Sequence, residues 1–221
     1  MKLFLEALIK FLCGLVFVGL QLFLPAGGLN YCFGWLFLAL LFGPMLVLGA
    51  VLLVKSPDLL RKRLDSREQQ AAQKGVVALS GLLFLSGFIV AGFDFRFGWS
   101  QMPTAVTVAA SVVLLIAYAL YAEVMRENAY LSRTVKVDAG QTVIDSGLYG
   151  IVRHPMYAAT VCLFLAIPLV LGSWWSLLCF SPYPVVIAVR IIGEEELLTA
   201  ELPGYAAYCQ KVRYRLIPFI W

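Results

Sequence analysis

Charged residues and histidine are scarce in this sequence of 221 residues. Only 14% of the residues are charged, and the chain contains a single histidine, His154. Hydrophobic residues make up 62% of the chain and the mean hydropathy is +0.88, well above the values typical of water-soluble domains. These proportions exclude an ordinary soluble fold and indicate a protein whose solvent is lipid.

Several cofactor and metal signatures are also missing from the sequence. It contains no G-x-G-x-x-G, P-loop, H-E-x-x-H or G-x-S-x-G motif, which argues against a soluble-type nucleotide site. One histidine and five cysteines without a C-x-x-C pair give too few ligands at metal-binding spacing. We therefore expect free thiols and no metal site.

The net charge of +4 does not indicate a nucleic-acid partner. The basic residues lie between apolar runs and not along one stripe with interleaved aromatics. Lys2 and Lys10 precede an apolar run that also fits a secretory signal peptide. That run is long for a signal peptide and a second one follows almost at once, so we expect a retained first helix.

Apolar runs long enough for membrane helices recur along the chain. A transmembrane helix needs roughly 20 mostly apolar residues, and the sequence lacks the alternation typical of barrel strands. We therefore expect an all-α, polytopic integral membrane protein with about six transmembrane helices. The expected spans are residues 4–24, 31–54, 76–93, 103–125, 156–171 and 174–191.

The last two spans are separated only by residues 171–174, which predicts a tight C-terminal helical hairpin. Pro168, Pro182 and Pro184 interrupt it. A proline frees backbone groups that a neighbour or a cavity must satisfy, although simple kinking is the plainer interpretation. Polar residues gather on both sides of the hairpin. We divide the chain into N-terminal transmembrane helices (1–125) and a catalytic region (126–221) comprising a cytoplasmic loop, the hairpin and an interfacial tail.

The bias of lysine and arginine between short loops predicts the orientation. The connection at 25–31 has no charge, and the one at 93–101 has a single basic residue. Residues 55–74 contain six: Lys55, Arg61, Lys62, Arg63, Arg67 and Lys74. With six spans, both termini are expected in the cytoplasm, in a prokaryotic inner membrane more readily than in the endoplasmic reticulum.

Two polar motifs flank the hairpin. Arg153-His154-Pro155 at the start of the fifth span can reflect topology and an interfacial histidine, or the first helical turn can bind a ligand carboxylate. Arg190 and Glu194 are four residues apart, so they share one helix face. They can belong to a solvated interfacial helix or to a functional site. A tight hairpin would bring both motifs together.

These motifs resemble those of the isoprenylcysteine carboxyl methyltransferase family and its prokaryotic relatives, over about residues 126–221. The matching stretches are Gly147-Leu148-Tyr149, Arg153-His154-Pro155-Met156-Tyr157, Arg190 with Glu194-Glu195, and Gly204-Tyr205. The resemblance implies S-adenosylmethionine as cofactor, in a pocket between the hairpin and the preceding loop that opens to the cytosol. It also implies a lipophilic or lipidated acceptor that enters from the bilayer.

The resemblance also implies roles for individual residues. Arg190 would face the acceptor and, with Glu194, carry the catalysis. Cofactor contacts would come from Gln141, Thr142, Val143, Ile144, Tyr149, Arg153, His154, Pro155, Tyr157, Glu194 and Glu195. The family often has a histidine where Gln141 stands.

The expected reaction is methyl transfer to an isoprenylcysteine-like carboxylate at the cytoplasmic membrane face. A carboxylate is already nucleophilic and needs a cation such as Arg190 to hold it. A phospholipid or other amine acceptor would need a base, for which Glu194 is the nearest residue. The sequence leaves these two chemistries open, together with the oligomeric state.

Two further functions remain open. The tail from Tyr208 to Arg215 is similar to that of the sterol reductases, which would imply a membrane oxidoreductase that uses NADPH. A transporter or scaffold is the other alternative. Transporters place polar groups near the bilayer midplane, whereas the charges here gather at one face.

Overall fold

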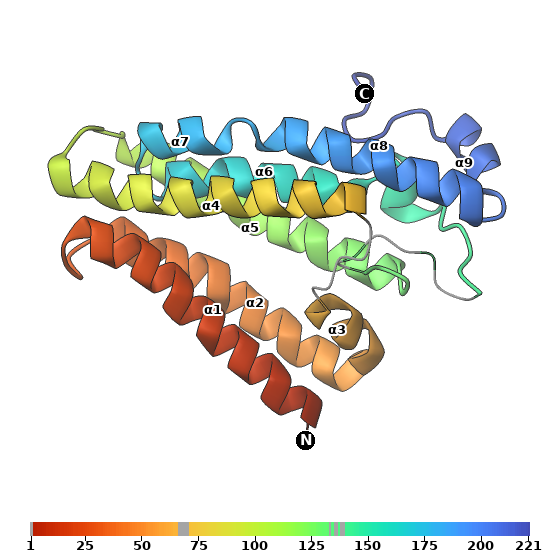
Figure 1. The fold of residues 1–221 in the computed structure, drawn as a ribbon, viewed down its shortest axis with the longest axis horizontal. Coiled ribbons are helices and arrows are strands. Elements are labelled where there is room, and N and C mark those ends of the chain that lie inside the picture. Colours follow the sequence, from red (N-terminus) through yellow and green to blue (C-terminus); the bar gives the residue numbers. More distant parts are fainter. Residues whose placement is uncertain (1, 66–70, 133, 135–136, 138–139) are drawn as a thin grey trace.

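The computed structural model describes residues 2–65, 71–132, 134, 137 and 140–221, and the side chains of 71 and 72 are not described (Figure 1). Arg67, used above to predict orientation, lies outside the described residues. Those residues form helices and no strand, which confirms the expected all-α class. The elements are α1 (Lys2–Ala26), α2 (Cys32–Lys55), α3 (Pro57–Leu64), α4 (Ala71–Phe97), α5 (Thr104–Glu127), the 3-10 helix η1 (Gly147–Gly150), α6 (Pro155–Val170), α7 (Trp174–Phe180), α8 (Tyr183–Glu201) and α9 (Tyr205–Lys211).

Within the described residues, five helical segments are long and apolar enough to cross a membrane. They are Lys2–Ala26, Cys32–Lys55, Gln73–Phe97, Thr104–Glu127 and Trp174–Glu201, the last combining α7 and α8. The apolar helix α6 has only 16 residues, about 24 Å at 1.5 Å per residue, against roughly 30 Å of hydrocarbon. The chain has the helices of a polytopic membrane protein, and the count of six spans stays a prediction.

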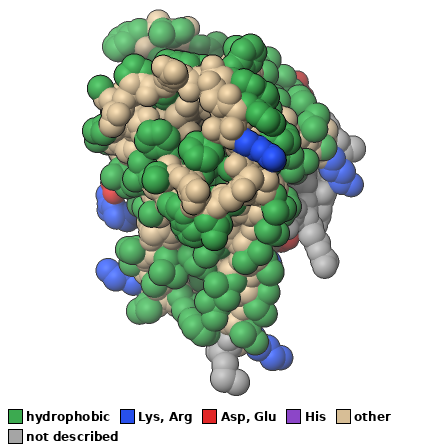
Figure 2. All heavy atoms as spheres, turned by 90° about the vertical axis from the view of Figure 1, so that its left-hand side faces the viewer, with side chains coloured by type: hydrophobic (Ala, Val, Ile, Leu, Met, Phe, Trp, Pro, Cys, Tyr) green, Lys and Arg blue, Asp and Glu red, His purple; other side chains and the backbone are tan. Residues whose placement is uncertain are grey.

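The outer surface of these helices is hydrophobic. Val16 and Phe17 on α1 are 59% and 61% exposed, and Val47 on α2 is 65% exposed. Figure 2 views the molecule from the left-hand side of Figure 1, and hydrophobic side chains cover much of this surface as well, with few charged ones. Exposed apolar area of this extent is costly in water and favourable against lipid chains, so the surface agrees with a membrane location.

The helices form two groups that meet at one end of the molecule. Helices α4 to α8 lie side by side, whereas α1 and α2 form a hairpin that leans away from them toward α3 (Figure 1). We call the end that carries α3, η1 and α9 the site end, and the opposite end the far end. At the far end α1 approaches α4 closely, because a Cβ on Gly92 would lie 2.6 Å from the carbonyl oxygen of Leu22.

A buried carboxylate and a buried tyrosine link the connections at the far end. Asp94 is 2% exposed and accepts hydrogen bonds from the backbone nitrogen and the hydroxyl of Ser100, both at 2.6 Å, and from the hydroxyl of Ser173. The hydroxyl of Tyr31 donates to the Leu171 carbonyl oxygen at 2.5 Å. These bonds fix the end of α4 against the turn between α6 and α7.

Helix α3 is an element that the apolar pattern did not predict. Its basic residues face outward or sit half-buried, while Leu59 and Leu60 are buried. Pro57 at its first position suits a helix start. The predicted tight turn between the last two apolar segments is present. The second of these segments forms two helices, because the helix is interrupted between Phe180 and Tyr183, where a proline interruption was expected.

Candidate active site

One cavity of about 1270 Å³ runs from the site end into the helical region. Its inner part, which we call the apolar limb, is lined mainly by hydrophobic side chains of α1, α2, α4 and α6, among them Phe11, Met45, Phe84, Leu163 and Ile167. Its outer part, the polar limb, is lined by the loop before η1 and by polar residues of α6, α8 and α9. The cavity therefore joins an apolar space to a polar one.

Most of the residues expected at the cofactor line this cavity. They are Gln141, Thr142, Val143, Ile144, Tyr149, Arg153, His154, Tyr157 and Glu194, together with Arg190. Pro155 and Glu195 are buried and are not among the lining residues. The structure thus gives no support for these two as cofactor contacts.

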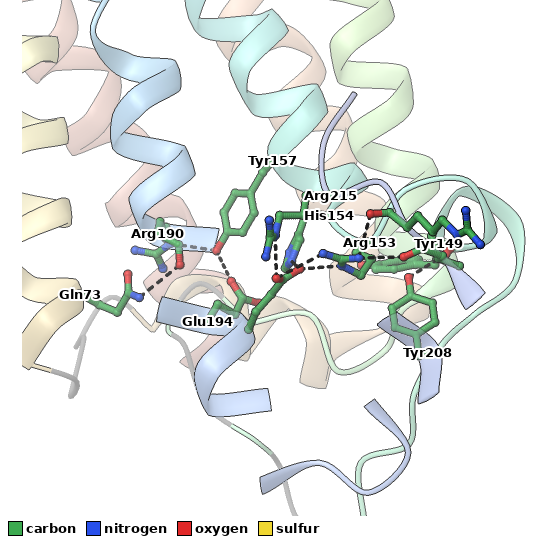
Figure 3. Close-up of polar contacts among 12 residues, drawn as sticks. Gln73, Tyr149, Arg153, His154, Tyr157, Arg190, Glu194, Tyr208 and Arg215 are labelled. Carbon is green, nitrogen blue, oxygen red and sulfur yellow. Dashed lines mark hydrogen bonds and ion pairs between the residues drawn. The ribbon is translucent and has the colours of Figure 1, made fainter. Parts of the chain in front are cut away.

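Glu195 belongs instead to a buried charge cluster that joins the residues before α6, helix α8 and the C-terminal tail, and its partners Arg153, His154 and Arg215 are labelled in Figure 3. Its Oε1 atom lies 2.7 Å from Nε of Arg153 and 3.1 Å from Nε2 of His154. Its Oε2 atom lies 2.8 Å from Nε of Arg215. Both Glu195 and Arg153 are 8% exposed. Arginine pairs of this geometry stabilise a buried carboxylate, so the cluster positions the walls of the polar limb.

The backbone before α6 is paired with the tail. The N–H groups of Arg153 and His154 donate to the carbonyl oxygens of Tyr214 and Arg215, both at 2.9 Å. Nη1 of Arg153 donates to the carbonyl oxygens of Val212 and Arg213 at 2.9 and 3.0 Å. These N–H groups already donate to backbone carbonyl oxygens. If a ligand carboxylate binds at the start of α6, as the sequence allows, it does so through other donors.

Tyr157 links the two residues that were expected to carry the chemistry. Its hydroxyl donates to Oε2 of Glu194 at 2.5 Å and accepts from Nε of Arg190 at 2.9 Å (Figure 3). All three side chains line the cavity. The start of α6 and the polar part of α8 therefore meet at Tyr157. The sequence predicted such a meeting of the two polar motifs that flank the hairpin.

Gln73 on α4 is a buried neighbour of this group that sequence reasoning missed. It is 2% exposed, and its Nε2 atom donates to the Arg190 carbonyl oxygen at 3.3 Å. A Cβ on Gly193 would lie 2.8 Å from the same nitrogen, so glycine allows α4 to approach α8 here. The sequence around Gln73 contains no pattern from which its contact with Arg190, 117 residues later, could have been predicted.

The loop that carries Tyr149 is anchored from two sides. The carboxylate of Glu127 accepts from the Leu148 backbone nitrogen at 3.0 and 3.2 Å. Nδ2 of Asn128 donates to the Tyr149 hydroxyl at 2.9 Å, and the Tyr208 hydroxyl donates to the Tyr149 carbonyl oxygen at 2.7 Å. Burial raises the pKa of Tyr149 to about 12.

Helix α3 and α9 brace the same loop from outside. Nη1 of Arg63 donates to the Ser132 carbonyl oxygen at 3.2 Å, and its guanidinium lies 5.2 Å from the centre of the Tyr121 ring. Nζ of Lys211 lies 2.6 Å from Oδ2 of Asp145, and this ion pair holds the pKa of Asp145 below its ordinary value. Both contacts tie the loop to neighbouring helices.

The polar limb has groups that suit S-adenosylmethionine. The Tyr205 hydroxyl is buried at the cavity wall and has no hydrogen-bond partner within the described residues. Such a group calls for a ligand or a water. The amide of Gln141, the hydroxyl of Thr142 and the carboxylate of Glu194 line the same space. Together they offer donors for a carboxylate or ribose and an anion for a cationic group.

Comparison with known proteins places the similarity in the region that builds this site. Residues 105–204 match the family model described as phospholipid methyltransferase. An alignment over 99 residues is 28% identical to a Delta(14)-sterol reductase of Mus musculus, and it covers 40% of this chain and 22% of that protein. A stretch of 90 residues, also 40% of the chain, is 29% identical to the uncharacterized protein YpbQ of Bacillus subtilis (strain 168) and covers 54% of it.

The matched region thus spans about a fifth of one relative and about half of the other. The family match runs from the start of α5 through the hairpin to the residue before α9. It supports membrane methyltransferases as the class that this region resembles. The finer resemblance to isoprenylcysteine carboxyl methyltransferases is taken up as part of the proposal below.

Proposed function

We propose that this protein transfers a methyl group from S-adenosylmethionine to a lipophilic acceptor at the cytoplasmic membrane face. The observation that carries the proposal is a single cavity that joins a polar limb, lined by most of the expected cofactor residues, to an apolar limb between membrane helices. The match of residues 105–204 to phospholipid methyltransferases supports methyl transfer. The cavity volume exceeds that of common ligand pockets, which are up to about 1,000 Å³, and leaves room for two molecules.

An isoprenylcysteine-like carboxylate is the acceptor that we propose. The guanidinium of Arg190 lines the cavity where the two limbs meet and would hold the acceptor anion. When bound in the polar limb, S-adenosylmethionine would supply the methyl group, and a carboxylate held by Arg190 would accept it without needing to lose a proton. The protein therefore acts mainly by alignment, which can contribute about 7 to 11 kcal/mol.

An amine acceptor, such as a phospholipid amine, is the second methylation chemistry. The family match favours an amine acceptor, because the matching family model is described as phospholipid methyltransferase. An amine must lose one proton, and Glu194 is the carboxylate that lines the cavity next to Arg190. Its hydrogen bond from Tyr157 places that proton acceptor on the cavity wall.

The proposal is tested by calorimetry of S-adenosylmethionine and S-adenosylhomocysteine binding in detergent, followed by turnover with farnesylcysteine and with phosphatidylethanolamine. We expect His154→Ala to weaken cofactor binding, because His154 lines the polar limb and contacts Glu195. We expect Arg190→Ala to spare cofactor binding and lower turnover. Normal binding and turnover in both variants would contradict the proposed site.

A reductase that uses NADPH is the second candidate function. The observation that favours it is the similarity to a Delta(14)-sterol reductase over 99 residues. The same calorimetry with NADPH separates the two functions. Tight binding of NADPH without binding of S-adenosylmethionine would replace the methyltransferase with the reductase.

A further inference from the structure

Gln21 is a polar residue in the second half of α1, where all residues from Phe11 to Ala26 except Gln21 are uncharged and apolar or small. Its side chain lines the cavity. The amide nitrogen Nε2 is buried, and it has no hydrogen-bond partner within the described part of the chain. A donor without a partner in an apolar environment costs several kcal/mol, so its place on the cavity wall calls for an explanation.

Gln21 lies in the part of the apolar limb toward the far end. It is the cavity-lining residue of α1 farthest from the site end. The lining residues farthest from the site end on the other helices are Leu41, Phe88, Tyr118, Ile167 and Tyr183. Ten residues of α6 separate Tyr157 from Ile167, which corresponds to about 15 Å along the helix axis. The amide thus lies well away from the group around Tyr157.

Neither a second protein chain nor the neighbouring residues account for this donor. The nitrogen is buried inside this chain, where another copy could not reach it. Tyr118, another polar residue that lines the cavity, already donates its hydroxyl to the Leu41 carbonyl oxygen at 2.9 Å. A buried water needs two to four polar partners, and Leu41, Phe88 and Ile167 offer none through their side chains.

We propose that the acceptor carries a second polar group on its chain, an oxygen of a hydroxyl or carbonyl, and that Nε2 of Gln21 donates to it. The seven residues between Tyr183 and Arg190 correspond to about 10 Å. The second oxygen therefore lies roughly 10 to 15 Å from the anion held at Arg190. This inference rests on the proposed function for the occupant of the cavity, and it narrows the acceptor to an amphiphile with polar groups at two depths.

The test compares the binding of dodecanoic acid and of its terminally hydroxylated counterpart to the detergent-solubilised protein, without S-adenosylmethionine. We expect the hydroxylated acid to bind the wild type about two- to tenfold more tightly, the worth of one hydrogen bond. Gln21→Leu removes the donor and should abolish or reverse this preference. Leu20→Ala, at a lipid-exposed position outside the cavity lining, should leave the preference unchanged.

Gln21→Asn provides a second variant, because it keeps the amide and shortens its reach, and we expect it also to lose the preference. A wild type that binds neither acid, binds both equally, or keeps its preference in Gln21→Leu would contradict the inference. The measurement is independent of methyl transfer. A protein that prefers the hydroxylated acid but binds no S-adenosylmethionine would overturn the proposed function and leave the Gln21 contact standing.

Discussion

Glu195 shows how a buried carboxylate in a site can serve the architecture around it. It accepts from Arg153, His154 and Arg215, which come from the entrance of α6 and from the tail. Its neighbour Glu194 points instead to Tyr157 and the cavity. Two adjacent residues of α8 therefore have different roles. Glu195 stabilises the charge cluster, and that cluster positions the cavity wall to which Glu194 belongs.

We expect Glu195→Gln to destabilise the protein strongly. Removing one partner of a buried ion pair leaves the remaining charges uncompensated, which costs about 3 to 5 kcal/mol. Glu196→Gln is the matched control, because Glu196 is exposed on the same helix and a surface charge contributes little. Denaturation of the solubilised protein measures both. Equal midpoints for the two variants would show that the cluster does not stabilise the fold.

At Gln141 and Tyr149 we predict unequal effects on cofactor binding. Tyr149 is buried and anchored by Asn128 and Tyr208, so Tyr149→Ala removes a fixed part of the cavity wall. Gln141 is half-buried on the loop and departs from the histidine common in the family. Calorimetry should therefore show a larger loss of S-adenosylmethionine affinity for Tyr149→Ala. Equal losses would mean that the loop residues are matched to the family in a shifted register.

Among the helices, the contact of α1 with α4 depends on a residue without a side chain. Gly92→Ala would place a Cβ 2.6 Å from the Leu22 carbonyl oxygen, so the helices must separate. Gly75→Ala in the same helix meets nothing within 4 Å and should be neutral or stabilising, by up to about 1 kcal/mol of helix propensity. Thermal unfolding in detergent compares them, and a stable Gly92→Ala variant would contradict this close contact.

The helices that the sequence revealed are those whose apolar runs are long. These runs predicted α1, α2, α4 and α5 because lipid requires about 20 apolar residues per crossing. Helix α3 was missed, since Arg61, Lys62 and Arg63 make it polar and its two buried leucines are too few for a periodic signal. Helix α8 also continues to Glu201, beyond the predicted end of the sixth span at 191, because polar residues can extend a helix past the hydrocarbon.

The site was predictable to the extent that motifs at adjacent helix ends must meet. A tight hairpin predicted that Arg153 and His154 lie near Arg190 and Glu194. In the structure both residues contact the next residue, Glu195, and it is Tyr157 that contacts Glu194 and Arg190. The pairing of Arg153 with the tail was not predictable, because residues 60 positions apart leave no local pattern. Gln73 and Gln21 were missed for the same reason: the meaning of each depends on which helix packs against it.

For the molecule as a whole we predict that the far end and the site end lie on opposite sides of a membrane. Gln101 and Glu201 are exposed at these two ends. In a variant without native cysteines, a membrane-impermeant maleimide should label Gln101→Cys on intact bacterial spheroplasts. It should label Glu201→Cys only after permeabilisation, because lysine and arginine favour the cytoplasm. Labelling of both from one side would contradict the orientation.

The tilt of the α1–α2 hairpin determines the shape of the cavity. The two helices touch α4 at the far end, where Gly92 allows close approach, and diverge from it toward α3 (Figure 1). Residues of α1 and α2 line the apolar limb together with residues of α4 and α6, and Gln21 lies in its part toward the far end. The tilt of the helix pair therefore contributes to the space that a lipid chain would occupy.

The pairing of Arg153 with the tail also sets an order of events on the ribosome. Arg153 is synthesised 60 residues before Arg213, whose carbonyl oxygen accepts its hydrogen bond. At roughly 5 to 20 residues per second this interval lasts roughly 3 to 12 seconds. During that time the membrane helices that precede the tail can insert, while the guanidinium and the backbone beside His154 lack these partners. The polar limb therefore matures last, after the lipid-facing part of the molecule is in place.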